Sequence, residues 1–372
     1  MNDEAGVTQP FGAITPPPLP WSVPTRPQRM FFTGTGGEYF KIWIVNVLLT
    51  ILTLGIYSAW AKVRRHQYFY RHTRVAGAGF DYHGTPLAIL KGRILAGLLF
   101  GGYYVAGLIS PTLGLVAFVA LAAMLPWLVV RSLRFRLYNS SYRGLRFRFE
   151  GGTGEAYGVF LGLGIASLLS LFTLGPLWHQ RMKRYVHGNS SYGRTRFAFD
   201  ASVSAFYRVY LLAAGVLVAL VIGTAVVIAG LVGTTALTSG LEGGEAAAGA
   251  GAALAVLVFA CAYIFGSVGL WALVRARVQN LVWNHTRLGP HQFTCRLQAR
   301  TLMFITLTNL LGIVFTLGLF KPFAEVRLMR YVASSFTLVP AGNIDEFLAG
   351  ERQEVAAVGD AAVDMFDLEI AF

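Results

Sequence analysis

Two long stretches of the chain contain no lysine or arginine, and each is long enough for a helical hairpin. One lies between Arg93 and Arg131 and the other between Arg208 and Arg275, and the basic residues gather in the blocks that flank them. A Lys or Arg at the centre of a membrane helix costs roughly 2.5–3.5 kcal/mol, and cytoplasmic loops collect these residues. The pattern predicts a polytopic membrane protein with helical hairpins at 94–130 and 209–274.

The composition favours the same class. Of the 372 residues, 55% are hydrophobic and 13% are charged, whereas a soluble domain usually carries about 25% charged residues. The net charge of +13 lies at the ends of the apolar stretches, which indicates anionic lipid headgroups as the counter-charge. We therefore expect the lipid bilayer as a partner and no nucleic acid. A homo-oligomer is compatible with this composition.

Three further apolar stretches share a Thr-Leu-Gly core. The three cores are Thr53-Leu54-Gly55, Thr173-Leu174-Gly175 and Thr316-Leu317-Gly318. In each copy an arginine follows the glycine by nine residues, at Arg64, Arg184 and Arg327. The stretches around them, which we call the TLG segments, lie near 39–60, 156–178 and 301–323. Shared sequence at three places indicates internal repeats.

A second recurring element lies within or after the basic blocks. It combines Ser or Thr, a glycine turn and a pair of aromatic residues, as in YNSSYRGLRFRFEG and GNSSYGRTRFAF. Phe147 and Phe149 alternate with Arg146 and Arg148, which is the period of a strand. We expect short extended or hairpin elements at the cytoplasmic interface, with the phenylalanines facing the bilayer or the core.

These features predict an all-α polytopic membrane protein with internal repeats. Residues 1–30, which are polar and rich in proline, are predicted to form a disordered tail. Residues 31–340 form the repeated membrane domain, which holds the TLG segments and both helical hairpins. Residues 341–372 form an acidic C-terminal tail.

The charge distribution leaves two topologies open. If all seven apolar stretches span the bilayer, the 31 basic residues divide almost evenly between its two sides. If the TLG segments enter, turn at the glycine and return, every basic residue lies on one side, as the positive-inside rule favours. Against this, an apolar run of about 20 residues usually forms a plain spanning helix.

Five residues are candidates for ligand binding or for a structural break. Glu38 and Glu155 stand just before the first and second TLG segments, where an acid either caps a helix or binds a cation or proton. Gly55, Gly175 and Gly318 are the expected breaks, since irregular backbone at membrane depth lines a cavity or is buried in protein.

Four residues are candidates for contact with lipid headgroups. They are aromatic or basic residues of the blocks after the Thr-Leu-Gly cores: Trp60, Arg64, Arg184 and Arg327. The cysteines, Cys261 and Cys295, offer neither a disulfide framework nor a metal spacing. No nucleophile and base can be paired, so we expect no enzyme, no catalytic or metal-binding residue and no cofactor.

The segment TLGIYSAWAKVR, the recurring Gly-Phe element and the acidic end DMFDLEIAF resemble the YjgN family of bacterial inner-membrane proteins, from about Phe31 onwards. The second and third copies of the segment have Gln180 and Phe323 in place of Trp60. The resemblance implies a multi-pass protein of the inner membrane. It supplies no catalytic residues, since the family has no assigned function.

Two functions remain open. Discontinuous helices in internal repeats build many transport sites, so the first hypothesis is a protein that binds or translocates a small molecule, an ion or a lipid. The alternative is a non-transporting scaffold or envelope-stress protein that holds anionic lipid on its basic face and a protein partner on its acidic tail.

Overall fold

Pairs of helices alternate with short antiparallel strands from β1 at Gln28 to the last described strand, which ends at Val339. The computed structural model describes residues 26–239, 244–342, 344, 346–351 and 353. The helices are α1 (Gly36–Leu52), α2 (Ser58–His72), α3 (Pro86–Ile109), α4 (Pro111–Tyr138), α5 (Thr153–Ala156), the π-helical η2 (Tyr157–Gly162), α6 (Leu163–Leu169), α7 (Gly175–Gly188), α8 (Val203–Ser239), α9 (Gly244–Asn284), α10 (Ala299–Phe315) and α11 (Lys321–Ser334).

The strands follow the helix pairs in order. They are β1 (Gln28–Arg29), β2 (Phe31–Phe32), β3 (Thr73–Val75), β4 (Ala78–Tyr82), β5 (Ser140–Tyr142), β6 (Leu145–Phe149), β7 (Ser190–Tyr192), β8 (Thr195–Phe199), β9 (Thr286–Leu288), β10 (His291–Cys295) and β11 (Phe336–Val339). Residues 1–25 of the predicted tail, which was expected to run to residue 30, lie outside the described residues. The last residues of that tail include strand β1. Residues 354–372 of the acidic tail also lie outside the described residues.

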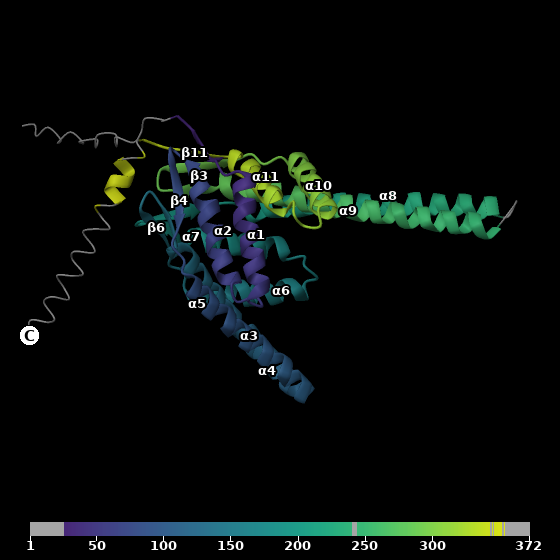
Figure 1. Ribbon diagram of the computed structural model, residues 1–372, viewed down its shortest axis with the longest axis horizontal. Coiled ribbons are helices and arrows are strands. Elements are labelled where there is room, and N and C mark those ends of the chain that lie inside the picture. The colour runs from purple at the N-terminus through teal and green to yellow at the C-terminus, as the bar shows by residue number, and fades with distance from the viewer. Residues whose placement is uncertain (1–25, 240–243, 343, 345, 352, 354–372) are drawn as a thin grey trace, which may run out of the picture.

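All described strands belong to one antiparallel sheet that nearly closes on itself. Its order is β1-β11-β10-β9-β8-β7-β6-β5-β4-β3-β2, so the two edge strands are consecutive in the chain and only Met30 separates them. The Met30 N–H still donates to the carbonyl of Phe336 at 3.0 Å. We call this sheet the strand ring. It lies at one end of the molecule, and the helices extend away from it (Figure 1).

The prediction of an all-α fold is therefore wrong. The expected extended elements exist, but they pair with one another into an 11-stranded sheet instead of standing as separate features at an interface. Each strand has only two to five residues, so a single strand has too few hydrogen bonds to be stable alone. Pairing all round the ring supplies the missing partners, and this pairing joins segments far apart in the chain.

The longer strand of a β-hairpin can have one apolar and one polar face, as β6 shows. In β6, Leu145, Phe147 and Phe149 face inward, whereas Arg146 and Arg148 are exposed outside. The outer face also carries ion pairs, such as Arg287 with Asp200 at 2.5 Å. The Phe-x-Phe alternation thus places the phenylalanines in the core of the protein and not against the bilayer.

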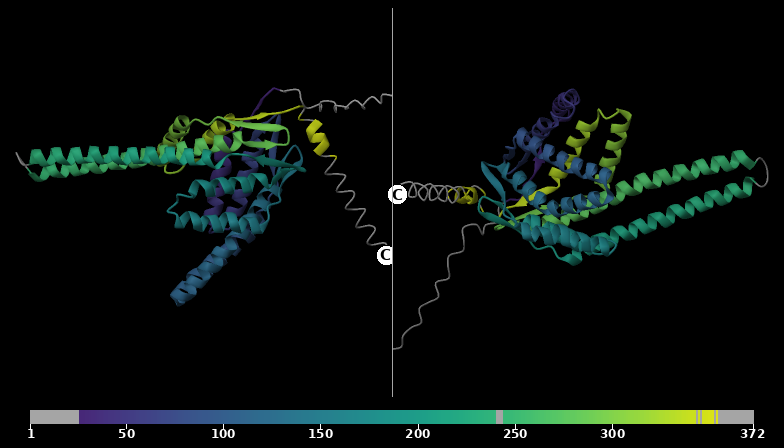
Figure 2. Two further views of the ribbon diagram at one scale, coloured as in Figure 1. Left: turned by 180° about the vertical axis from the view of Figure 1, so that it is seen from behind. Right: turned by 90° about the horizontal axis from the view of Figure 1, so that it is seen from below.

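Two of the helix pairs, α3/α4 and α8/α9, project from the rest of the molecule as long hairpins and diverge from each other (Figures 1 and 2). Among the described residues, four helices are long and apolar enough to cross a membrane: Pro86–Ile109, Pro111–Tyr138, Val203–Thr234 and Gly249–Asn284. They cover the two stretches that lack Lys and Arg. Their side chains are largely exposed, with Leu98 at 69% and Val256 at 69%.

The three TLG segments fold differently. Each breaks into two helices that lie side by side, α1 with α2, α6 with α7, and α10 with α11 (Figure 1). α1 contains 17 residues, which is about 25 Å of helix at 1.5 Å per residue. A segment that turns back this way brings its basic block to the side where it began. This is what the topology with non-spanning TLG segments, and hence only four spanning helices, requires.

Candidate functional site

The interior of the strand ring is an apolar cavity of about 290 Å³. Each β-hairpin contributes inward side chains from both of its strands. The first strands supply Val75, Tyr142, Tyr192 and Leu288. The second strands supply Phe80, Phe147, Phe197 and Phe293. The phenylalanines follow one another around the ring, with centroids 6.5 Å apart for Phe147 and Phe197 and 6.2 Å for Phe197 and Phe293.

Two tyrosine hydroxyls in the cavity wall are bonded to backbone. Tyr142 donates to the carbonyl of Val75 at 2.8 Å, and Tyr192 donates to the carbonyl of Tyr142 at 2.8 Å. A buried tyrosine hydroxyl needs a partner, and here each one bonds to the preceding β-hairpin. The bonds turn the rings across the wall and leave only their apolar atoms facing the cavity.

Residues of two helices and of the C-terminal part of the described chain also line the cavity. The wall includes Trp283 of α9 and Met329 of α11. Residues 344 and 346–351 are helical, and Phe347 and Leu348 of this segment line the cavity. We call residues 344 and 346–351 the cover helix. The last predicted domain, 341–372, thus begins with an element that packs on the ring.

The cover helix is held by a buried carboxylate. Glu351 is only 7% exposed, and it accepts hydrogen bonds from the backbone N–H of Arg194, at 2.6 Å, and from the hydroxyl of Thr195. Gly193 precedes these donors with a φ of +60°, and a Cβ there would overlap the Glu351 carboxylate. Glycine is therefore needed both for the turn and for the close approach.

His291 stands beside the cover helix at the rim of the cavity. Its Nδ1 accepts from the backbone N–H of Ala341 at 3.2 Å, and its ring lies 4.6 Å from that of Phe347. The Nε2 has no hydrogen-bond partner within the described part of the chain. Burial lowers the pKa of His291, so the imidazole is neutral at pH 7 and suits an apolar rim.

The predicted acids lie outside this cavity, at helix starts. Glu38 forms a capping box with Thr35, whose side chain accepts from the Glu38 N–H at 3.3 Å, and it also accepts from the Tyr68 hydroxyl. These hydrogen bonds to Thr35 lower the pKa of Glu38. Glu155 accepts from the Asn189 amide at 3.3 Å. Both carboxylates thus stabilise local structure.

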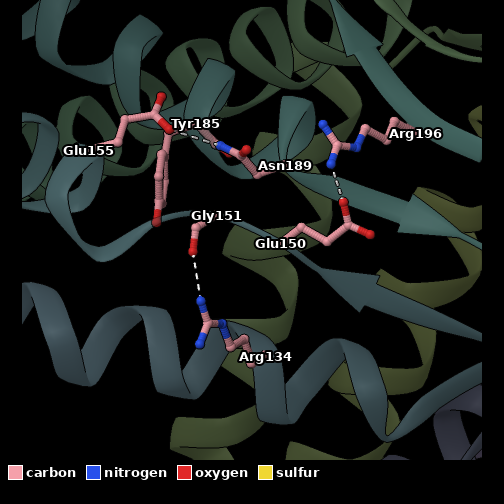
Figure 3. A network of polar contacts seen from close by, with 7 residues as sticks. All are labelled: Arg134, Glu150, Gly151, Glu155, Tyr185, Asn189 and Arg196. Atoms are coloured by element: carbon pink, nitrogen blue, oxygen red, sulfur yellow. Dashed lines mark hydrogen bonds and ion pairs between the residues drawn. The ribbon is translucent and has the colours of Figure 1, made fainter.

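Figure 3 shows how the surroundings of Glu155 connect three elements. Arg134 of α4 donates to the carbonyl of Gly151 at 3.0 Å, and the Tyr185 hydroxyl of α7 donates to that of Gly152 at 2.9 Å. On the ring exterior, Arg196 pairs with Glu150. The network fixes the chain where it leaves β6.

The TLG segments share one turn, in which a hydroxyl residue precedes two residues of positive φ. The pairs are Leu54 and Gly55 (φ 50° and 94°), Leu171 and Phe172 (50° and 63°), and Leu317 and Gly318 (49° and 95°). We call 53–58, 170–175 and 316–321 the tip turns. Gly175 is the last residue of its tip turn and the first of α7, and it does not have the positive φ of Gly55 and Gly318. The reason is that Ser170 takes the place of the threonine in this copy, so the turn begins three residues earlier.

Every backbone N–H of each tip turn has an acceptor. The hydroxyl is central: Thr53 donates to the carbonyl of Leu49 at 2.7 Å and accepts from the N–H of Tyr57 at 2.9 Å. Thr316 does the same with Gly312 and Phe320, and Ser170 accepts from Leu174. The other donors in the three turns reach backbone carbonyls. Apolar side chains surround this backbone, with Leu54 and Leu317 each 95% exposed.

The predicted headgroup residues do not form one site. Trp60 stacks on Tyr57 at 6.0 Å, and the Arg64 guanidinium lies 5.8 Å from the same ring. Arg184 is exposed on α7. Arg327 donates to the Thr308 hydroxyl at 2.8 Å.

The tip-turn offset changes which arginines are equivalent. In every helix pair, one arginine stands nine residues before the first strand that follows: Arg64, Arg131, Arg181, Arg277 and Arg327. We call these five residues the arginine level. Alignment of the three Thr-Leu-Gly sequences makes Arg184 the equivalent of Arg64 and Arg327. By distance from the following strand, the equivalent residue is Arg181. The alignment missed Arg131 and Arg277 because their helix pairs lack the Thr-Leu-Gly sequence.

Sequence reasoning also missed the cavity. Its one signal was the alternation of phenylalanine with polar residues, which does not say that four such segments surround a common space. Within the described residues, no group of three His, Cys, Asp or Glu side chains could hold a metal ion.

Comparison with known proteins gives a family and partial relatives. The model of a family described as bacterial protein of unknown function (DUF898) matches residues 27–365. The inner membrane protein YjgN of Salmonella typhimurium is 34% identical over 126 residues, which are 32% of this chain and 31% of that protein. The protein of the same name from Escherichia coli K12 is 35% identical over 125 residues, 32% of this chain and 30% of its own.

The match thus spans less than a third of the length of these curated relatives. No solved structure matches the chain.

Proposed function

We propose that this chain, which belongs to the DUF898 family of bacterial proteins of unknown function, is a multi-pass inner-membrane protein that binds an apolar ligand, such as a lipid acyl chain, in the strand ring. Its relatives include proteins named inner membrane protein YjgN, as the sequence motifs predicted. The observation that carries the proposal is the apolar cavity in the strand ring, of about 290 Å³. A cavity of about 150 Å³ lined by aliphatic and aromatic side chains binds benzene, and this one is larger.

The charge distribution supports a membrane position with the strand ring in the cytoplasm. The four candidate spans extend from the ring, and the flanking basic residues lie at the ring end of each hairpin. The arginine level lies nine residues from the ring in every helix pair, about 14 Å along a helix. Each helix pair thus has one arginine at the same distance along its helix from the ring, which suits contact with the headgroups of the cytoplasmic leaflet, in accordance with the positive-inside rule.

The tip turns support insertion of the three short helix pairs from the same side. An exposed leucine-rich tip is unfavourable in water, and an unpaired backbone group is unfavourable in hydrocarbon. The exposed leucines Leu54, Leu171 and Leu317 avoid the first cost in a bilayer, and the internal pairing of every N–H in the turns avoids the second. Lys321 ends the third turn, and Ser58 at the end of the first accepts a hydrogen bond from Arg93.

Binding in the cavity can be tested with a photoreactive palmitate that carries a diazirine at the end of its chain. The full-length protein in nanodiscs should be labelled on the inward residues of the strands. Replacing Val75 and Leu288 together by phenylalanine fills the cavity, and labelling of the strands should fall at least fivefold. Leu98→Phe, on the exposed face of α3, is the matched control and should leave it unchanged. Equal strand labelling in both variants would rule out the cavity as the site.

The topology can be tested independently of any ligand. Replacing Cys261 and Cys295 by alanine gives a cysteine-free background, and single cysteines then replace Arg64, Arg184 or Arg327. All three should react with a membrane-impermeant maleimide from the cytoplasmic side only. Reaction of positions 64 and 184 from opposite sides would show that the second TLG segment spans the membrane.

A further inference from the structure

A polar hollow lies between α7 and α9, outside the strand ring. Its volume is about 420 Å³, and its polar lining consists of His179 and Lys183 of α7 with Arg275 and Gln279 of α9. Arg275 is the first cation after the second stretch without Lys or Arg, and its guanidinium lies 5.1 Å from the ring of Trp271. An arginine beside a tryptophan at the end of an apolar span marks the headgroup level.

The cations of the hollow have no acidic counterpart. Lys183 is partly buried, and the loss of solvent lowers its pKa, which the charges of Arg136 and Arg275 lower further. Lys183, Arg275 and the nearby Arg136 form no ion pair with any carboxylate of the described residues. Arginines on the ring exterior, such as Arg196 and Arg287, do form such pairs. The hollow therefore holds a concentrated positive charge that an anion would neutralise.

The hollow continues into an apolar groove between α8 and α9. The groove has a volume of about 360 Å³ and runs along α9 from Phe259 to Leu270, which is about 16 Å of helix. Leu270 lines both the groove and the hollow, so the two spaces adjoin. The opposite wall of the groove is formed by α8 from Leu217 to Ile228.

We propose that the hollow and the groove together bind one anionic phospholipid, with its phosphate between Lys183 and Arg275 and an acyl chain in the groove. Basic pockets between membrane helices on the cytoplasmic side bind anionic lipid headgroups. The amphipathic shape commits the site to a lipid, because a free phosphate would leave the adjoining groove unused. The inference rests on the proposed membrane position but not on the strand-ring cavity.

Binding is measured by native mass spectrometry of the full chain in a non-ionic detergent, titrated with phosphatidylglycerol. The double variant K183Q/R275Q should bind it about thirtyfold more weakly, or about 2 kcal/mol, since each cation near a lipid surface contributes about 1 kcal/mol. The matched control R74Q/R148Q removes two exposed arginines of the strand ring, outside the hollow, and should change the affinity less than threefold. Phosphatidylcholine with the same chains should bind the wild type at least tenfold more weakly.

Two further arms separate the lipid from other ligands. Ala262→Phe narrows the groove, and it should weaken phosphatidylglycerol without affecting inorganic phosphate. Phosphate that binds as tightly as the lipid, or phosphatidylglycerol that tolerates A262F, would identify a free-anion site. Equal losses in K183Q/R275Q and R74Q/R148Q would mean diffuse attraction and overturn the proposal. K183R/R275K keeps both charges and should bind as the wild type does, which separates the loss of charge from misfolding.

Failure of the lipid site is distinguishable from failure of the proposed function. If the chain is not membrane-integral, alkaline carbonate will extract it from membranes. If only the strand-ring cavity is misassigned, V75F/L288F will retain its strand labelling by palmitate while phosphatidylglycerol binding still depends on Lys183.

Discussion

The hydroxyl of Thr53 offers the sharpest test of how the tip turns reach into a bilayer. Thr53→Val keeps the shape of the side chain but removes the acceptor of the Tyr57 N–H, which lies 2.9 Å from the threonine oxygen. The carbonyl of Leu49 keeps its bond from the Thr53 N–H at 3.0 Å. The substitution therefore leaves one donor unpaired. Such a group costs about 1–3 kcal/mol when water cannot reach it.

The measurement is reversible unfolding in mixed micelles, followed by tryptophan fluorescence as the fraction of sodium dodecyl sulfate rises. T53V should lower the free energy of unfolding by about 2 kcal/mol. Thr316→Val should cost a similar amount, because Thr316 holds the Phe320 N–H at the same distance of 2.9 Å. The two losses should add, since the turns share no partners.

Two control variants isolate the unpaired N–H. Thr53→Ser restores the acceptor and should recover most of the stability. Thr50→Val removes a hydroxyl that donates to the carbonyl of Asn46 at 2.6 Å and has no bond from a backbone N–H, so it should cost much less. If T53V and T50V lower the stability equally, or if T53V costs less than about 0.5 kcal/mol, the tip turn does not exclude water.

Three further predictions concern the strand ring and its cover. Glu351→Ala removes two hydrogen bonds to a buried carboxylate, so hydrogen exchange of residues 344–351 should accelerate by an amount equivalent to at least about 2 kcal/mol; unchanged protection would refute the docking. Gly193→Ala should destabilise the protein more than Gly77→Ala, by thermal melting, because both have positive φ but only Gly193 abuts Glu351; equal losses would contradict the contact. Burial, with Lys183 nearby, lowers the pKa of His187 to about 4, below its value of about 6.5 in the unfolded chain. Stability should therefore be full above pH 6.5 and fall by up to about 3 kcal/mol as the pH drops toward 4; His187→Phe should flatten this dependence, and a slope like that of the wild type would refute the assignment.

Local sequence was enough to place the hairpins and the strand alternation. The absence of Lys and Arg between Arg93 and Arg131, and between Arg208 and Arg275, locates α3/α4 and α8/α9, because the cost of a charge in hydrocarbon applies residue by residue. The alternation at Phe147 and Phe149 indicates a strand because side chains of a strand alternate between its two faces.

Repeated letters were a weaker guide than repeated geometry. The Thr-Leu-Gly core of the second copy begins three residues after the hydroxyl that forms its turn, since Ser170 fills the place of Thr53. A turn of this kind needs a hydroxyl residue followed by two residues of positive φ. In the second copy, Leu171 and Phe172 have the positive φ values, and neither is a glycine. Their conformation depends on the packed helix pair, so Gly175 and Arg184 could not be corrected from the sequence.

What the sequence determined by itself was the preference of each segment for lipid or water, because that preference is a property of the local side chains. Closure of the strand ring depended on the tertiary structure. β1 and β11 are separated by about three hundred residues, and the two-residue β1 has too few hydrogen bonds to be stable without β11. The cavity, its cover by Phe347 and Leu348, and the meeting of Lys183 with Arg275 exist only once the ring and helix pairs bring distant segments together.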